Sequence, residues 1–122
     1  MADRDIPVTG GEGVVFVNRF TVQAQPEHFE RIFADTSAYF ARQPGFVRHT
    51  LVRHVDQPGA YVNIAQWRDA SSLRQAVAHP DFGPHAAALR AISTSDPNLY
   101  EVCQHQSVDQ RAPEADRREG VK

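Results

Sequence analysis

Two asparagines in otherwise apolar strand-like segments are the residues of this sequence best suited to chemistry. Asn18 lies between Phe16 and Phe20 on one face of its segment, and Asn63 shares a face with Trp67. Asparagine is unfavourable in strands, and a buried amide without partners costs about 1–3 kcal/mol. Two such amides on aromatic-rich faces predict a cavity in which amide N–H groups meet a ligand. The alternative is that each amide caps a bulge or bonds to neighbouring backbone.

The common catalytic motifs are absent from the sequence. The segment Gly10-Gly11-Glu12-Gly13 precedes a strand instead of following one, so it does not form a phosphate loop. There is no Gly-x-Ser-x-Gly elbow, and the single cysteine, Cys103, has no context for a nucleophile and no disulfide partner. The six histidines include no metal-binding pair at i,i+4 with a glutamate between them. We therefore predict no metal site from these motifs, although a metal site assembled from distant residues stays open.

The elements that must position the asparagines follow from periodicity and turn residues. Helices are expected over 27–43, 70–78 and 82–92, and strands over 14–24, 46–55, 60–67 and 98–107. This order predicts an α+β fold of the ferredoxin-like, split-βαβ type, with a four-stranded antiparallel sheet and helices on one face. The other face would expose Val15 and Val17. We expect a second copy to cover it, giving a homodimer.

Composition narrows the class of partner. The chain has 122 residues and a formal net charge of −2, which argues against nucleic acid or an anionic membrane as a partner. The N-terminus has no apolar signal segment and no run of about 20 apolar residues exists, so a cytoplasmic location is expected. Charges concentrate in 1–13 and 108–122, which we predict to be loosely ordered tails around a domain at 14–107. Every aromatic residue lies in that domain, which suits a small planar aromatic ligand.

Three segments carry a family resemblance: Val17-Asn18-Arg19-Phe20, Gln43-Pro44-Gly45-Phe46, and Val62-Asn63-Ile64-Ala65-Gln66-Trp67. Together they resemble the antibiotic biosynthesis monooxygenase superfamily of dimeric α+β barrels. The narrower pattern Asn-x-Ala-Gln-Trp resembles the cofactor-independent anthrone oxygenases of aromatic polyketide pathways. The resemblance covers about residues 14–107.

The resemblance implies that an anthrone is oxidised to an anthraquinone by dioxygen, without metal or flavin. In those enzymes the functional positions correspond here to Asn18, Asn63 and Trp67. The amides would stabilise a developing oxyanion, and the indole would stack on the substrate, stabilise a radical pair, or bond to a peroxide. The residues expected to line the substrate site are Phe16, Phe20, Phe33, Phe40, Leu51 and His49.

Two other functions stay open from the sequence. Haem-degrading members of the superfamily share the asparagine at Asn18 and carry a histidine near His85, but Ala76 stands where they have a helical tryptophan. The second alternative is a non-catalytic dimeric ligand-binding or stress protein. On the anthrone side, Leu73 stands where a related enzyme has a tyrosine, so a tyrosine relay does not carry over.

The base that removes the anthrone proton is not identified by the sequence. His49, His54 and Arg90 are candidates because they are titratable or cationic. Spontaneous deprotonation of a bound substrate is the alternative.

Overall fold

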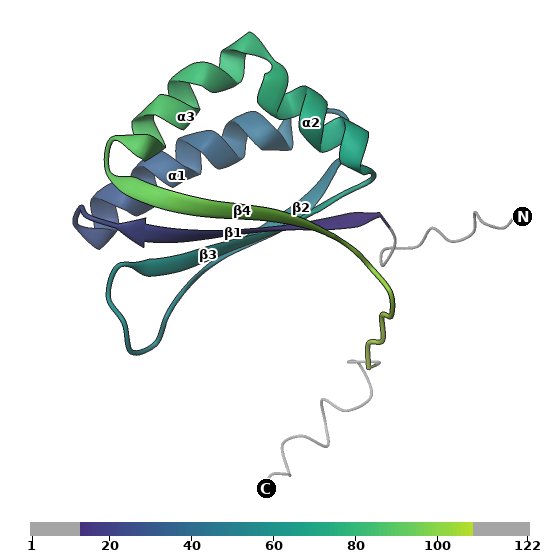
Figure 1. Ribbon diagram of the computed structural model, residues 1–122, viewed down its shortest axis with the longest axis horizontal. Coiled ribbons are helices and arrows are strands. Elements are labelled where there is room, and N and C mark those ends of the chain that lie inside the picture. Colours follow the sequence, from purple (N-terminus) through teal and green to yellow (C-terminus); the bar gives the residue numbers. More distant parts are fainter. Residues whose placement is uncertain (1–12, 109–122) are drawn as a thin grey trace, which may run out of the picture.

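The computed structural model describes residues 13–108 and shows a four-stranded antiparallel sheet with its helices on one face (Figure 1). The strand order is β2-β3-β1-β4. The elements are, in chain order, β1 (Val14–Val22), α1 (Pro26–Ala41), β2 (Phe46–Arg53), β3 (Ala60–Trp67), α2 (Ala70–Ala78), the 3₁₀ turn η2 (Pro80–Phe82), α3 (Gly83–Arg90) and β4 (Ser93–Glu101). The predicted ferredoxin-like fold is confirmed. No helix within 13–108 is long and apolar enough to cross a membrane.

The last strand differs from the prediction. It begins at Ser93, not at residue 98, and it ends at Glu101. The strand includes Asp96 and Pro97, which are residue types uncommon in strands, but β4 pairs only with β1 within the described sheet and so lies at its edge. An edge strand tolerates proline because one side of its backbone needs no ladder hydrogen bonds. Apart from Gly13 and Val108, the predicted tails lie outside the described residues.

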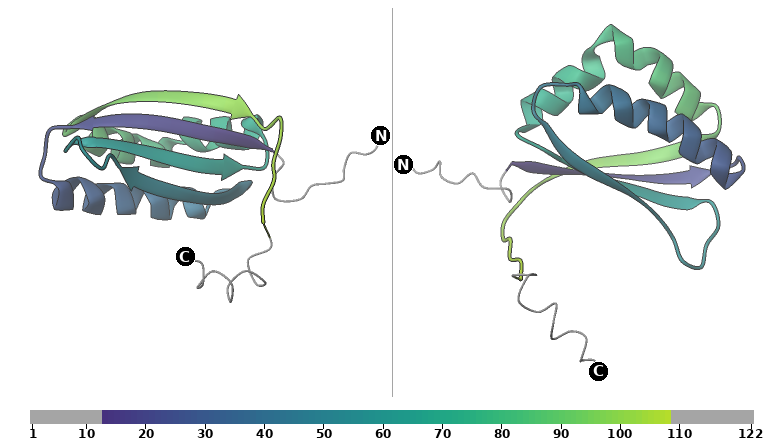
Figure 2. Two further views of the ribbon diagram at one scale, coloured as in Figure 1. Left: turned by 90° about the horizontal axis from the view of Figure 1, so that it is seen from below. Right: turned by 180° about the vertical axis from the view of Figure 1, so that it is seen from behind.

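Two buried clusters hold the helices on the sheet. The first joins β1, α1, β3 and α3 through Phe20, Phe29, Phe33, Tyr61 and Leu89. The second joins the other end of β3 to α2 through Ala65, Trp67, Leu73 and Ala76. The helices lie over a single face of the sheet in both views of Figure 2. Side chains on this face of the sheet therefore lie in a layer between the sheet and the helices.

The start of β2 and the start of α2 are fixed against each other. Gly45 has φ +90°, and a side chain there would collide with Ser72. The Gly45 carbonyl accepts a hydrogen bond from the Arg68 backbone N–H at 2.7 Å. Asp69 caps α2 by accepting from the Ser72 N–H at 2.8 Å. These contacts hold Phe46, which follows Gly45, and α2 over the same end of the sheet.

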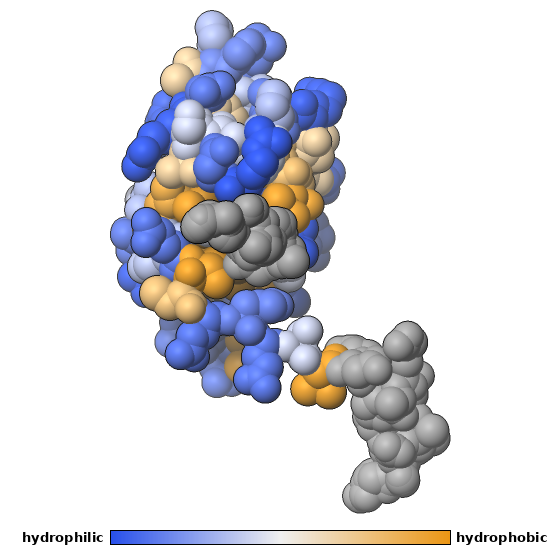
Figure 3. Space-filling view, turned by 90° about the vertical axis from the view of Figure 1, so that its right-hand side faces the viewer, coloured by the Kyte–Doolittle hydropathy of each residue, from blue (hydrophilic) through white to orange (hydrophobic). Residues whose placement is uncertain are grey.

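The face of the sheet opposite the helices carries apolar side chains that nothing in residues 13–108 covers. Ile64, Val52 and Tyr100 are 42%, 41% and 53% exposed on it. Val15 and Val17, between them on β1, are only half-buried. Figure 3 views the molecule from the end where β1 begins, and it shows hydrophobic residues at the surface there. A surface of this kind marks an interaction site.

Candidate active site

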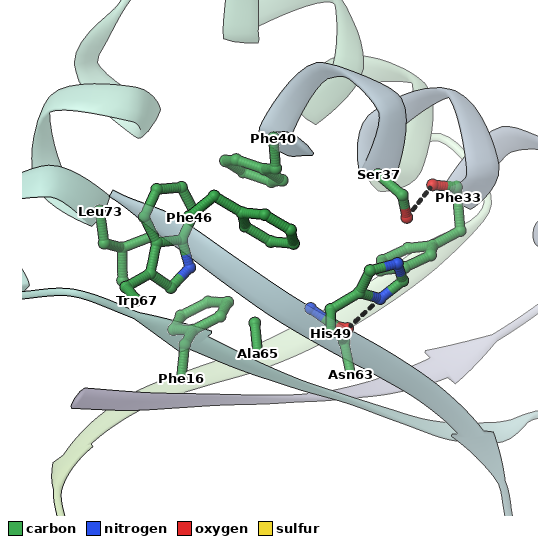
Figure 4. Close-up of a pocket in the computed structure, with 10 residues that line it drawn as sticks. All are labelled: Phe16, Phe33, Ser37, Phe40, Phe46, His49, Asn63, Ala65, Trp67 and Leu73. Carbon is green, nitrogen blue, oxygen red and sulfur yellow. Dashed lines mark hydrogen bonds between the residues drawn. The ribbon is translucent and has the colours of Figure 1, made fainter. Parts of the chain in front are cut away.

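A cavity lies between α1 and the sheet, and its wall is mostly aromatic (Figure 4). The space inside it is small, about 20 Å³, which is room for about one water molecule, so a larger ligand enters only when the aromatic walls move apart. Its lining residues are Phe16, Phe33, Ser37, Phe40, Phe46, His49, Asn63, Ala65, Trp67 and Leu73. The structure thus brings together six predicted site residues: Phe16, Phe33, Phe40, His49, Asn63 and Trp67. Ser37, Phe46, Ala65 and Leu73 complete the wall and were not among the predicted site residues.

Strand register explains how distant residues meet in this cavity. Ala65 on β3 pairs with Phe16 on β1 and with His49 on β2, so one row of side chains crosses three strands. Side chains at i and i+2 of a strand share a face, so Asn63 and Trp67 flank Ala65 on the helix side. The short alanine side chain between larger neighbours leaves the floor of the cavity open. Phe33, Ser37 and Phe40 close it from α1 at helical spacing.

His49 and Asn63 form the polar pair of the cavity. His49 Nδ1 lies 3.1 Å from Asn63 Oδ1. An amide oxygen only accepts hydrogen bonds, so Nδ1–H is the donor in this contact and Nε2 is the ring nitrogen left for a ligand. Asn63 is 7% exposed, and Figure 4 shows its amide nitrogen on the side turned toward the cavity. The pair therefore offers a ligand one basic nitrogen and one amide donor.

Trp67 is held rigidly at the other end of the cavity. It is 1% exposed and packs edge-on against Phe40 and Phe46, with ring centroids 5.7 and 5.3 Å away. In Figure 4 the indole nitrogen lies on the ring edge nearest the cavity. No partner for this N–H is found in the part of the chain that the structure describes. Trp67 is therefore placed to offer a ligand both an aromatic edge and a hydrogen-bond donor.

Three predicted site residues do not line this cavity. Phe20 belongs to the buried core cluster, and Leu51 packs half-buried against that cluster. Asn18 is the direct register partner of Asn63, yet it lines a separate hollow of about 200 Å³ beneath α3 together with Arg90 and other residues. Asn18 Oδ1 is buried and has no hydrogen-bond partner among the described residues. A buried acceptor without a partner is uncommon and calls for a ligand or water.

The three candidate bases differ in their position relative to the aromatic cavity. His54 Nδ1 accepts hydrogen bonds from the backbone N–H groups of Asp56 and Gln57, both at 3.0 Å, so this histidine builds the turn before β3. Arg90 lines the separate hollow beneath α3. Only His49 of the three lines the aromatic cavity.

The two positions that bear on the haem alternative, Ala76 and His85, both pack against Tyr39. Ala76 is 3% exposed, and its carbonyl accepts a hydrogen bond from the Tyr39 hydroxyl at 2.7 Å. The His85 ring packs against Tyr39, with centroids 5.3 Å apart. The place of a haem-contacting aromatic is thus occupied by the protein's own packing. Within 13–108 no group of three or more His, Cys, Asp or Glu is placed to hold a metal ion.

Residues 13–88 match the antibiotic biosynthesis monooxygenase family. The chain therefore belongs to this family, as its sequence motifs and fold predicted. Deoxynogalonate monooxygenase from Streptomyces nogalater is 58% identical over 91 residues, which are 75% of this chain and 77% of that protein. The crystal structure of SnoaB, a cofactor-independent oxygenase from Streptomyces nogalater, superposes with a TM-score of 0.73 at 54% identity and covers 81% of this chain and 99% of that chain. A conserved protein from Methanosarcina mazei Go1 shares the fold alone, with a TM-score of 0.65 at 16% identity over 76% of this chain and 96% of that one.

Proposed function

We propose that this chain is a cofactor-independent monooxygenase that oxidises an anthrone-type polyketide intermediate, such as 12-deoxynogalonic acid, to an anthraquinone with dioxygen. The relative named deoxynogalonate monooxygenase supports the substrate class, and SnoaB supports chemistry without a cofactor. The observation that carries the proposal is the His49–Asn63 pair inside an aromatic-walled cavity. Aromatic walls suit a planar tricycle, which enters when they move apart, and its reacting centre needs a base and an oxyanion donor.

The first step is removal of a proton from the anthrone methylene. His49 Nε2 accepts it, while Nδ1 stays bonded to Asn63 Oδ1. The remaining electron pair spreads through the ring system onto the carbonyl oxygen as a phenolate-like anion. The Asn63 N–H donates to this developing charge, as the donors of an oxyanion hole do. The apolar walls exclude water, which strengthens this interaction.

The oxygen chemistry then follows from the substrate's own electrons. The anion passes one electron to dioxygen, and the resulting radical pair joins to form a C–O bond, giving a peroxide at the former methylene carbon. The Trp67 N–H is placed to donate to this peroxide. Protonation by His49 and loss of water leave the quinone carbonyl, so one oxygen atom of dioxygen enters the product and the other becomes water.

Asn18 stays a proposed site residue on the strength of its unpartnered acceptor. It pairs in register with Asn63, which lines the aromatic cavity, so the two amides lie on neighbouring strands. A substituent that extends past Asn63 would reach Asn18 Oδ1 and donate a hydrogen bond to it. Phe20 and Leu51 support the site indirectly, because they pack the core on which α1 rests.

We also propose that the protein acts as a cytoplasmic homodimer without nucleic-acid or membrane partners. The support for the dimer is the apolar sheet face opposite the helices, with Ile64 and Tyr100 exposed at its centre and edge strands. A second copy placed on this face would bury it. The single cysteine, Cys103, is exposed and suits a reducing compartment.

The proposed reaction is tested with isotopic oxygen. Purified protein is given an anthrone under ¹⁸O₂, and the quinone is analysed by mass spectrometry. We expect one labelled oxygen per quinone and formation above the spontaneous rate. A product labelled from H₂¹⁸O instead, or no rate above background, would overturn the proposal.

A further inference from the structure

The helix wall of the aromatic cavity carries a single polar side chain, Ser37, among the lining residues that α1 supplies. Phe33 and Phe40 lie on either side of it along the helix. The Ser37 hydroxyl donates to the Phe33 carbonyl at 3.0 Å. A serine hydroxyl has one hydrogen and two acceptor lone pairs, so Ser37 presents only acceptor capacity to the cavity.

The preceding residue shows that this position is distinct. Thr36 also donates its hydroxyl back along the helix, to the Ile32 carbonyl, but it is 2% exposed and does not line the cavity. Ser37 is half-buried and faces the space that a ligand would fill. The back-bond to Phe33 therefore fixes a hydroxyl oxygen in a wall that is otherwise aromatic on this side.

The opposite wall has the complementary polarity. Figure 4 shows Ser37 across the cavity from His49 and Asn63, which rise from β2 and β3. Asn63 offers an N–H donor to a ligand oxygen, and Ser37 offers an acceptor to a ligand hydrogen. A flat ligand held between these walls must carry an acceptor on one edge and a donor on another to satisfy both.

We propose that Ser37 determines substrate specificity by accepting a hydrogen bond from a ring hydroxyl of the anthrone. This inference rests on the proposed function and names a feature of its substrate class. A hydroxyl directly beside the central carbonyl already donates to that carbonyl. The hydroxyl that Ser37 recognises therefore lies further around the ring system, where its hydrogen is free.

The test compares matched substrates on the full-length protein and three variants. Unsubstituted anthrone, 2- and 3-hydroxyanthrone, and the corresponding methoxyanthrones differ in whether a free donor is present. We expect the wild type to prefer one hydroxyanthrone over its methoxy counterpart by about 2- to 10-fold in kcat/KM, the size of one neutral hydrogen bond. Ser37→Ala removes this preference. Ser37→Thr keeps the hydroxyl and keeps the preference, and Thr36→Ser, outside the cavity, keeps it as well.

Two outcomes overturn the inference. Either the wild type does not distinguish a hydroxyl from a methoxy group at any position, or Ser37→Ala retains the wild-type preference. Binding of the hydroxy- and methoxyanthraquinones, followed by their absorbance shift, separates this inference from the proposed reaction. Loss of hydroxyl discrimination in Kd for Ser37→Ala supports the role of Ser37 even if no turnover occurs. Equal discrimination in both proteins contradicts it whatever the turnover.

Discussion

His49 Nδ1 lies 3.1 Å from Asn63 Oδ1, on neighbouring strands that meet at the cavity floor. One contact sets two orientations at once. It fixes the tautomer of the imidazole, with Nε2 as the basic nitrogen, and it turns the amide N–H away from the histidine. His49 as the base and Asn63 as the oxyanion donor thus orient each other, so loss of either residue should impair the function of the other.

The first prediction concerns this mutual dependence. His49→Gln should lower kcat by about 10²–10⁴-fold through loss of the general base, and Asn63→Ala should lower it by about 10²–10³-fold through loss of the oxyanion donor. Because each residue orients the other, the double variant should lose less than the product of the two single losses. Steady-state kinetics with far-UV circular dichroism as a folding control would measure this. Multiplicative losses would show that the two residues act independently.

The second prediction concerns the open floor at Ala65. Ala65→Val places two methyl groups between Phe16 and His49, so an aromatic substrate should no longer fit and activity should be lost. The cavity takes up part of the added volume, so the free energy of unfolding should change by less than about 1.5 kcal/mol.

A matched control for that substitution exists at Ala76. This alanine is equally buried but does not line the cavity. Ala76→Val should overpack the core and destabilise the protein by about 1–3 kcal/mol, while folded protein stays active. Denaturant unfolding gives the stability of both variants, and turnover gives their activity. Retained activity in Ala65→Val would show that the substrate binds elsewhere.

The third prediction concerns Trp67. Trp67→Phe keeps an aromatic ring edge-on to Phe40 and Phe46 but removes the indole N–H. We expect a lower kcat with little change in KM, because the N–H is proposed to meet the peroxide and not the substrate ground state. A rise in KM at unchanged kcat would instead assign Trp67 to substrate binding.

The fourth prediction is a pH dependence of stability at the start of α2. The Ser72 backbone N–H donates a hydrogen bond to the Asp69 carboxylate, and this is the largest cause of the lowered pKa of that carboxyl. The Ser72 hydroxyl and nearby Arg68 lower this pKa further. The folded protein therefore binds this proton less readily than the unfolded chain, so the stabilisation is present at neutral pH and is lost as pH falls through the lowered pKa. Asp69→Ala should cost about 1 kcal/mol at pH 7, and this difference should shrink in acid.

Asparagine provides the control for that cap. Asp69→Asn keeps a capping oxygen without a titrating proton, so its stability relative to Asp69→Ala should not vary with pH. Chemical unfolding of the three proteins between neutral and acidic pH gives the comparison. A constant difference between wild type and Asp69→Ala would contradict the role of the ionised carboxylate.

Local patterns predicted most of the fold. The alternation over 60–67 and the Asp69 cap before 70–78 matched β3 and α2 residue for residue, because both signals act within a few residues. The predicted bounds of the last strand were wrong: β4 runs from Ser93 to Glu101 and includes Pro97, which a strand tolerates at the edge of a sheet, and edge position is a property of the whole sheet. Asn63 stood out as an unusual residue type on an apolar strand face, whereas Trp67 was named as a site residue through the family resemblance.

Other site residues carry no local signal. Ala65 matters through the size of its neighbours on β1 and β2, and Ser37 matters because α1 turns it toward the sheet. Phe20 shares the face of Phe16 on β1, yet the former is core and the latter is cavity wall. Position along the strand relative to α1 makes this difference, and only the packed structure supplies it.

Oxygen uptake by protein stripped of metal and flavin tests the central claim most directly. Chelator-treated, flavin-free protein is mixed with an anthrone such as dithranol in an oxygen electrode, beside His49→Gln protein treated in the same way. We expect the stripped wild type to consume one dioxygen per quinone formed, well above the spontaneous rate, and the His49 variant to stay near that rate. Uptake that returns only when iron or flavin is added would contradict it.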